Sequence, residues 1–221
     1  MSAEDSARAG RTRKRTRIQE ENEERILNAA LEVFSTYGFR GATVDQIAAL
    51  AKMTKPNLLY YFRRKQDIYR AVLNRTLEMW LTPLEALSGA GDPAEEISAY
   101  IDRKLEMSRD NPKESRLFAM EIIQGAPALG DALTGRLKNL VTEKTAVIEQ
   151  WIAEGRLAPV DPHQLLFMIW ATTQHYADFD VQIRALLGHG IERPDKFVNA
   201  KATLEQVFLN GVRAEPRPGS T

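Results

Sequence analysis

The stretch TVDQIAALAKMTKPNLLYYFRRK, residues 43–65, predicts two short helices separated by a brief break. Thr43 followed three residues later by Gln46 is a capping-box pattern, which marks the start of the first helix. Thr54 can cap the second helix, and Pro56 falls in its first turn, where a missing N–H costs little. Two short helices joined in this way are typical of a helix-turn-helix.

The second of these helices carries side chains suited to the major groove of DNA. Lys55 can donate to guanine and Asn57 can pair with adenine, while the ring of Tyr60 can contact a thymine methyl group. Arg63 and Lys65 follow with charge that attracts phosphates of any sequence. The alternative is an ordinary pair of core helices, but such a pair would rarely place these polar and aromatic residues together on its exposed side.

Composition limits the class of protein. The chain has 221 residues, of which 43% are hydrophobic, so it can bury a substantial core. It contains no cysteine, which excludes disulfides, thiol catalysis and cysteine-ligated zinc. No apolar run is long enough to span a membrane and the basic N-terminus lacks an apolar signal segment, so we expect a cytoplasmic protein with no membrane partner.

Charge is distributed unevenly along the chain. Lys and Arg total 30 and so do Asp and Glu, which gives a formal net charge of zero. Residues 8–17, RAGRTRKRTR, contain only basic and neutral side chains, and basic residues dominate between positions 40 and 75. This asymmetry favours an anionic partner for the N-terminal third, although a solvated, solubilising face is the simpler alternative.

The remainder of the chain predicts an all-α fold of about nine helices, because apolar residues recur at helical spacing and no alternating strand pattern occurs. Asp92, Asn111 and Asp161, each followed by proline, predict three helix starts. Pro83 is expected to stop or kink the helix that begins near residue 66. The expected domains are listed in chain order: a flexible basic arm at 1–16, a helix-turn-helix domain at 17–64, a ligand-binding and dimerisation domain at 65–213, and a flexible tail at 214–221.

Residues 34–72, FSTYGFRGATVDQIAALAKMTKPNLLYYFRRKQDIYRAV, resemble the DNA-binding region of the TetR family of transcriptional regulators. The resemblance implies a homodimer that binds a double-stranded, palindromic operator. It implies phosphate contacts from Thr43, Tyr61 and Lys65 and base contacts from Lys55, Asn57 and Tyr60. Thr54, at the start of the helix, is also expected among the DNA-binding residues. Leu59 departs from the pattern, because many members have tyrosine there, which puts one DNA contact in doubt.

Blocks farther along, such as SRLFAMEIIQGAP (115–127) and LLFMIWATTQHYADF (165–179), resemble the pyrimidine-utilisation regulators of this family. This resemblance implies a repressor that binds uracil or thymine and then releases its operator. A regulator for another planar or aromatic ligand is the main alternative. A helical enzyme or adaptor without a DNA role is a third reading, but no nucleophile–base pair or phosphate loop supports it.

A pocket for a flat, neutral pyrimidine needs a stacking surface and an amide that both donates and accepts. Trp170 and Gln174 are four residues apart and therefore share a helix face. Trp80 lies at the end of the helix that follows the predicted helix-turn-helix. Weaker candidates on neighbouring helices are Ser108, Phe118 and Glu121. The alternative is that the tryptophans are ordinary core and Gln174 caps a carbonyl. No metal or cofactor site is predicted.

Residues 165–170, LLFMIW, are apolar on all sides of a helix. Such a helix is expected to be buried all round. Together with the last helix it suits a four-helix interface between two copies of the chain. A monomer core is equally compatible with this pattern.

Overall fold

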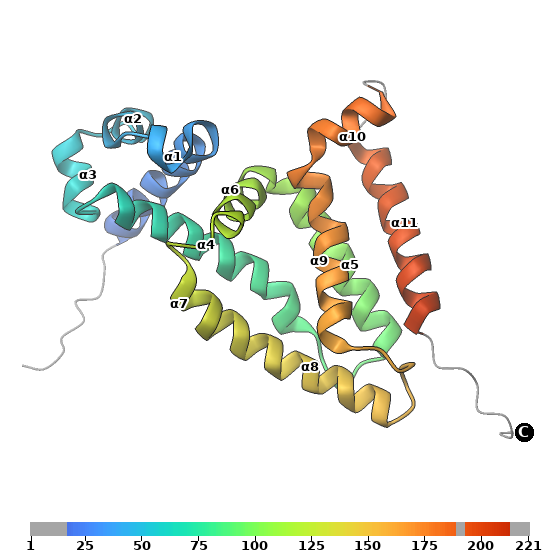
Figure 1. The fold of residues 1–221 in the computed structure, drawn as a ribbon. Coiled ribbons are helices and arrows are strands. Elements are labelled where there is room, and N and C mark those ends of the chain that lie inside the picture. The colour runs from blue at the N-terminus through green and yellow to red at the C-terminus, as the bar shows by residue number, and fades with distance from the viewer. Residues whose placement is uncertain (1–16, 189–192, 213–221) are drawn as a thin grey trace, which may run out of the picture.

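The computed structural model describes residues 17–188 and 193–212, and within these ranges every regular element is helical (Figure 1). The predicted all-α class is confirmed. The elements are α1 Arg17–Gly41, α2 Val44–Leu50, α3 Lys55–Tyr61, α4 Lys65–Ala86, α5 Pro93–Asp110, α6 Pro112–Ile123, α7 Gly130–Ala132, the π-helical segment η1 Leu133–Leu137, α8 Lys138–Ala153, α9 Pro162–Asp178, α10 Asp180–Leu187 and α11 Arg193–Val212. The expected arm at 1–16 and tail at 214–221 lie outside the described residues.

The described helices slightly outnumber the nine expected, for local reasons. The amphipathic stretch from about 130 to 154 is not one regular helix but is divided into α7, η1 and α8. The short helix α10 follows α9 directly, after Phe179, whose φ of −113° and ψ of 26° break the helical path. Neither feature leaves a clear mark on the hydrophobic period of the sequence.

Helices α1 to α3 and the first half of α4 form a small lobe, called here the head, at the left of Figure 1. The capping box at Thr43 is present, with Gln46 N donating to Thr43 Oγ1 at 3.2 Å and Thr43 N donating to Gln46 Oε1 at 2.8 Å. Thr54 caps α3, and Leu58 from α3 is fully buried in the core of the head. These local contacts fix α3 against α2.

Other start and stop signals were predicted with mixed success. Asp92 and Asp161 each accept hydrogen bonds from two backbone N–H groups, as expected for N-caps. The helix start predicted at Asn111 is confirmed, because α6 begins at Pro112, but the Asn111 side chain makes no capping hydrogen bond. Pro83 does not stop α4, which continues to Ala86. Because the proline lies one turn from the end, its helix loses little hydrogen bonding.

Helix α4 is shared by two hydrophobic cores. Tyr69 and Leu73 belong to the core of the head, whereas Leu77 and Leu84 belong to the core of the larger lobe, called here the body. Phe118 of α6 packs against both cores. A rotation or shift of α4 in the body is therefore transmitted to the packing of the head, because close-packed cores do not deform freely.

The body packs α5 against α9 and α11, with α8 along its lower side (Figure 1). Trp151 of α8 is fully buried there, and its indole N–H donates to the carbonyl of Gly89 at 3.1 Å. Among the described residues, no helix is both long enough and apolar enough to cross a membrane. Nor do they include a cluster of acidic or histidine side chains suited to a metal ion.

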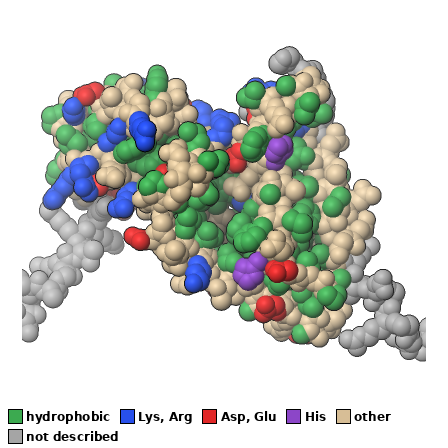
Figure 2. Space-filling model, viewed as in Figure 1, with side chains coloured by type: hydrophobic (Ala, Val, Ile, Leu, Met, Phe, Trp, Pro, Cys, Tyr) green, Lys and Arg blue, Asp and Glu red, His purple; other side chains and the backbone are tan. Residues whose placement is uncertain are grey.

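The apolar run in α9 is only partly buried. Leu165, Leu166 and Ile169 point into the core, but Phe167 and Met168 are each 47% exposed. The expectation of burial on all sides was therefore wrong for a single chain. Figure 2 shows apolar side chains gathered over this part of the body, and Phe179 and Leu186 beyond α9 are also exposed.

The buried indole of Trp151 gives a direct test of the body's core. Trp151→Ala is expected to lower the free energy of unfolding by about 3–5 kcal/mol, because it removes a large buried side chain and its hydrogen bond to Gly89. Urea denaturation followed by circular dichroism measures the loss. Glu149→Ala, an exposed position on the same helix, should change stability by less than about 0.5 kcal/mol. Equal losses in both variants would contradict this packing.

Candidate functional site

Helix α3 presents a row of polar and aromatic side chains away from the core of the head. Lys55, Asn57 and Tyr60 are all exposed, and Tyr60 is 71% accessible. The ammonium of Lys55 pairs with Asp45 of α2 at 2.9 Å. Both side chains face solvent, and exposed pairs of this kind contribute at most about 1 kcal/mol, so the lysine can exchange its partner for an anion or a base edge.

Tyr61 and Lys65 are held more firmly by the protein. The Tyr61 hydroxyl accepts a hydrogen bond from Asn22 Nδ2 at 2.9 Å, which leaves its own proton free to donate. The ammonium of Lys65 donates to the carbonyls of Phe39 and Ala42 at 2.7 and 2.8 Å. Lys65 therefore fastens the end of α1 to the start of α4, with one of its three protons remaining for a phosphate.

The apolar positions of α3 anchor it. Leu58 is fully buried, Phe62 is 9% exposed, and Leu59 packs partly buried against the same core. Basic side chains gather over the head in Figure 2. Arg64, which precedes α4, forms an ion pair with Asp67, and the hydrogen bond to Asp67 raises the pKa of the guanidinium, which stays charged. Arg63 is exposed beside it.

A second feature is a small cavity in the body. It lies between α4, α5, α6 and α9, and its lining includes Trp80, Phe118, Trp170 and Gln174. Four of the six residues predicted for a ligand site are thus brought together. The cavity volume is about 60 Å³, far below the roughly 300–1,000 Å³ of typical ligand pockets, and close to the space of two water molecules.

Lys104 and Tyr100 of α5 also line this cavity, and the sequence prediction missed both. The ammonium of Lys104 lies 3.8 Å from the centre of the Trp80 ring, and the residue is 3% exposed. Burial lowers the pKa of Lys104 to about 7, with Asp178 acting weakly in the opposite direction. A lysine on an amphipathic helix is usually solvent-exposed, so composition alone gave no signal for this position.

The indole nitrogens of the two cavity tryptophans have different partners. Trp170 donates to the Tyr100 hydroxyl at 2.6 Å, and burial raises the pKa of Tyr100, which therefore stays protonated. The indole nitrogen of Trp80 is buried and has no hydrogen-bond partner among the described residues. Unsatisfied buried donors are rare and call for an explanation.

Two predicted ligand residues lie elsewhere. Ser108 is buried one turn beyond Lys104 on α5, outside the cavity lining, and among the described residues its hydroxyl has no partner. Glu121 is 2% exposed at the junction of head and body. Its carboxylate accepts from the Tyr69 hydroxyl at 3.1 Å and from Ala128 N at 2.5 Å. Glu121 is therefore committed to holding α6 against α4.

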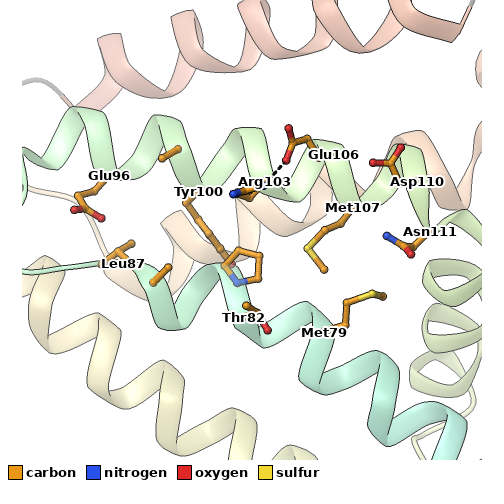
Figure 3. A pocket seen from close by; sticks show the side chains of 13 residues that line it. Met79, Thr82, Leu87, Glu96, Tyr100, Arg103, Glu106, Met107, Asp110 and Asn111 are labelled. Atoms are coloured by element: carbon orange, nitrogen blue, oxygen red, sulfur yellow. Dashed lines mark hydrogen bonds and ion pairs between the residues drawn. The ribbon is translucent and has the colours of Figure 1, made fainter. Parts of the chain in front are cut away.

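A larger groove opens between α4 and α5 on the other side of Tyr100 (Figure 3). Its volume is about 630 Å³. Met79 and Met107 form part of its apolar wall, and the Arg103–Glu106 ion pair lies on its rim at 3.0 Å. The sequence prediction did not single out this groove. Its charged side chains already have protein partners: Glu106 pairs with Arg103, Asp110 pairs with Arg109, and Glu96 accepts from Ser88 N.

Two family models together match most of the chain. The model described as "Bacterial regulatory proteins, tetR family" matches residues 26–72, and "YcdC-like protein, C-terminal region" matches residues 73–215. Among curated relatives, the HTH-type transcriptional regulator RutR of Escherichia coli K12 is 47% identical over 202 residues, covering 91% of this chain and 95% of that protein. The HTH-type transcriptional repressor SCO4008 of Streptomyces coelicolor is 32% identical over 48% of this chain and 52% of that protein.

Solved structures agree on the fold. A putative transcriptional regulator, SCO4942 from Streptomyces coelicolor, superposes with a TM-score of 0.69 at 23% identity, covering 88% of this chain and 99% of that one. AibR, in complex with isovaleryl coenzyme A and operator DNA, has a TM-score of 0.64 at 18% identity, covering 84% and 97%. With both the DNA-binding and C-terminal regions matched, the chain is a transcriptional regulator rather than an enzyme, and it belongs to the TetR family.

Proposed function

We propose that this chain is a homodimeric repressor that binds a palindromic operator through α3 and releases it on binding uracil or thymine. The main support for DNA binding is the exposed row of Lys55, Asn57 and Tyr60 on α3. This short helix is capped by Thr54 and anchored by buried residues. Such a helix fits the major groove of DNA. The proposed functional division places the reading head at 17–64 and the ligand-binding and dimerisation domain at 65–213, acting in the cytoplasm.

Roles within the head follow from exposure and hydrogen bonding. Lys55, Asn57 and Tyr60 are proposed to contact base edges. Thr43, Tyr61 and Lys65 are proposed to contact phosphates, for which Tyr61 and Lys65 each keep a donor proton beyond their protein partners. Thr54 serves as the cap that directs the start of α3 toward the groove.

Dimerisation is supported by the apolar side chains that a single chain leaves in solvent. Phe167 and Met168 on α9 are 47% exposed, and Val198 and Val207 on α11 are 65% and 63% exposed. Two copies pairing α9 and α11 would form a four-helix interface that removes this surface from water. A two-fold dimer places two reading helices about one helical turn of DNA apart, roughly 34–36 Å, which requires a palindromic operator.

The effector is proposed to enter the cavity lined by Trp80, Trp170 and Gln174. Stacking surfaces from indoles and the donor–acceptor amide of Gln174 suit the edge of uracil, in which C=O and N–H groups alternate. The chain is similar to RutR over 91% of its length, and its sequence resembles the regulators of pyrimidine utilisation. Both similarities support a pyrimidine as the effector. Because the cavity holds only about 60 Å³, a bound ring must push its walls apart.

That displacement gives a mechanism for release. Trp80 lies on α4, which also belongs to the core of the head, and Phe118 on α6 packs against both cores. Ring binding would shift α4 and thereby change the distance between the two reading helices of the dimer. A coupling free energy of about 1–3 kcal/mol is sufficient for a 5- to 150-fold change in operator affinity.

The reading-helix assignment is tested with operator DNA selected in vitro by the wild-type protein. Lys55→Ala and Tyr60→Ala should each weaken specific binding by roughly 1–3 kcal/mol and relax preference at one position, while leaving the oligomeric state unchanged in size-exclusion chromatography. Lys138→Ala, an exposed lysine on α8, is the matched control and should bind normally. Normal operator binding by both head variants would refute the assignment of α3.

The effector assignment is tested by fluorescence anisotropy of labelled operator. Saturating uracil should lower the affinity of the wild type about 5- to 150-fold. Gln174→Leu should bind the operator normally but lose most of the uracil response, because the amide that reads the ring edge is gone. Gln164→Leu, an exposed position on the same helix, should respond like the wild type. An operator affinity that uracil leaves unchanged would reject the effector and leave the DNA role intact.

A further inference from the structure

We propose that the basic segment RAGRTRKRT, residues 8–16, is a second DNA-binding element, which binds phosphates of the DNA that flanks each half-site read by α3. This inference deepens the proposed function and rests on it, because it assumes that the head binds DNA through α3. The segment lies outside the described residues. Two observations support its role: the small net charge of the described head, and the place where the chain enters α1.

The described head has little net charge of its own. Residues 17–65 contain eight basic and six acidic side chains, so their formal net charge is +2. Some of the basic side chains are already bound, since Lys55 pairs with Asp45 at 2.9 Å and Lys65 donates to two backbone carbonyls. Proteins gain much of their affinity for DNA when lysine and arginine replace the counterions of its phosphates. The described head alone is therefore a weak source of that attraction.

The segment 8–16 supplies the charge that the head lacks. It contains five basic side chains and no acidic one, which exceeds the net charge of residues 17–65. Four of the five are arginine. The guanidinium of arginine is planar and always charged, and it donates two parallel hydrogen bonds to the oxygens of one phosphate. The composition of the segment thus fits the phosphate backbone of DNA.

The chain enters α1 beside the surface that is proposed to face DNA. Helix α1 begins at Arg17, and Asn22 in its second turn donates to the Tyr61 hydroxyl at 2.9 Å. Tyr61 ends α3 and is a proposed phosphate contact, and Figure 1 shows the start of α1 next to the end of α3. Five residues of helix span about 7.5 Å, so the segment is joined to the head close to that phosphate.

The length of the segment suits the flanking DNA. Nine residues reach at most about 30 Å when extended. One turn of DNA is roughly 34–36 Å long. A segment that starts near Tyr61 can therefore contact phosphates within about one turn of the half-site, and it requires duplex beyond the base pairs that α3 reads.

The simpler alternative is that the segment only keeps the protein soluble. Without residues 8–16 the chain has 25 basic and 30 acidic side chains, a formal net charge of −5. A net charge of this size already favours solubility. The same negative charge repels DNA, so basic residues concentrated next to α1 and α3 are better explained by an anionic partner.

A second alternative is that the segment pairs with the acidic start of α1. Glu20, Glu21 and Glu24 are exposed there, and Glu21 pairs with Arg17 at 2.8 Å. Exposed ion pairs contribute at most about 1 kcal/mol each and are screened by salt. Duplex DNA carries one negative charge per about 1.7 Å of its axis. This much denser array of charge should displace the carboxylates as partners of the segment.

The test is operator binding by the full-length protein, measured by fluorescence anisotropy between about 50 and 200 mM salt. The variant Arg11→Gln, Arg13→Gln, Arg15→Gln, called here the glutamine variant, removes three charges from each subunit. Each phosphate contact contributes about −0.9 to the slope of log K against log salt concentration, so the slope should become shallower by up to about 2.7 for each subunit. A change smaller than about 0.9, the value of one contact, would overturn the proposal.

Two control variants separate charge from other effects. Replacing the same three arginines with lysine keeps the charge and should keep most of the wild-type slope. The variant Arg103→Gln, Arg109→Gln, Lys138→Gln removes as much charge from exposed positions on the body and should also keep the slope. A lysine variant with the slope of the glutamine variant would show that charge is not what binds, and would overturn the proposal.

The place of binding is tested with operator duplexes of two lengths. One duplex ends at the outer edges of the half-sites, and the other extends about ten base pairs, or one turn, beyond each edge. The longer duplex should steepen the salt dependence of the wild type more than that of the glutamine variant. An equal effect of length on both proteins would contradict binding of the segment to the flanks.

The outcomes separate the two proposals. If the wild type binds no operator, the proposed function fails and the role of the basic segment fails with it. If the wild type binds and the glutamine variant keeps its slope, or binds the operator more tightly as pairing with the start of α1 predicts, only the role of the segment is refuted. A shallower slope in the glutamine variant alone supports the assignment.

Discussion

Helix α4 runs without a break from the core of the head into the core of the body. One helix of 22 residues buries Tyr69 and Leu73 in the core of the head and Leu77 and Leu84 in the core of the body. Because a helix is stiff along its length, a shift of one end is transmitted to the other, so the two cores are mechanically joined. The ion-dipole contact of Lys65 and the hydrogen bond between Tyr69 and Glu121 fasten the same helix to α1 and α6.

The cavity beside α4 contains polar groups whose burial is energetically unfavourable. A buried lysine, an indole N–H without a partner among the described residues, and a volume of about 60 Å³ all occur at Trp80 and Lys104. Local features that conflict with stability often coincide with functional sites. We propose that a pyrimidine supplies the missing acceptor atoms, so that ligand binding relieves a polar mismatch and moves the helix that carries the mismatch.

Sequence alone was informative where structure is decided locally. The caps at Thr43, Thr54 and Asp161 depend on side chains within three residues of their partners, and the helix-turn-helix follows from them. It was less informative where distant helices meet. From its sequence, Lys104 is expected to be an exposed lysine on a helix, but it is buried because α5 packs against α4 and α9. Glu121 was predicted to contact the ligand, but in the structure its carboxylate accepts a hydrogen bond from Tyr69, which lies 52 positions away in the sequence. Phe167 was expected to be buried because an unbroken apolar run does not indicate which of its positions face solvent in a single chain.

If one movement of α4 links the cavity to the operator, as proposed, the two binding equilibria must be reciprocal. Uracil affinity should be measured for the free protein and for the protein saturated with operator DNA. If the two sites share one equilibrium, the operator must weaken uracil binding by the same factor, about 5- to 150-fold, by which uracil weakens operator binding. Equal uracil affinities in the two states would show that the cavity and the reading head are not coupled through α4.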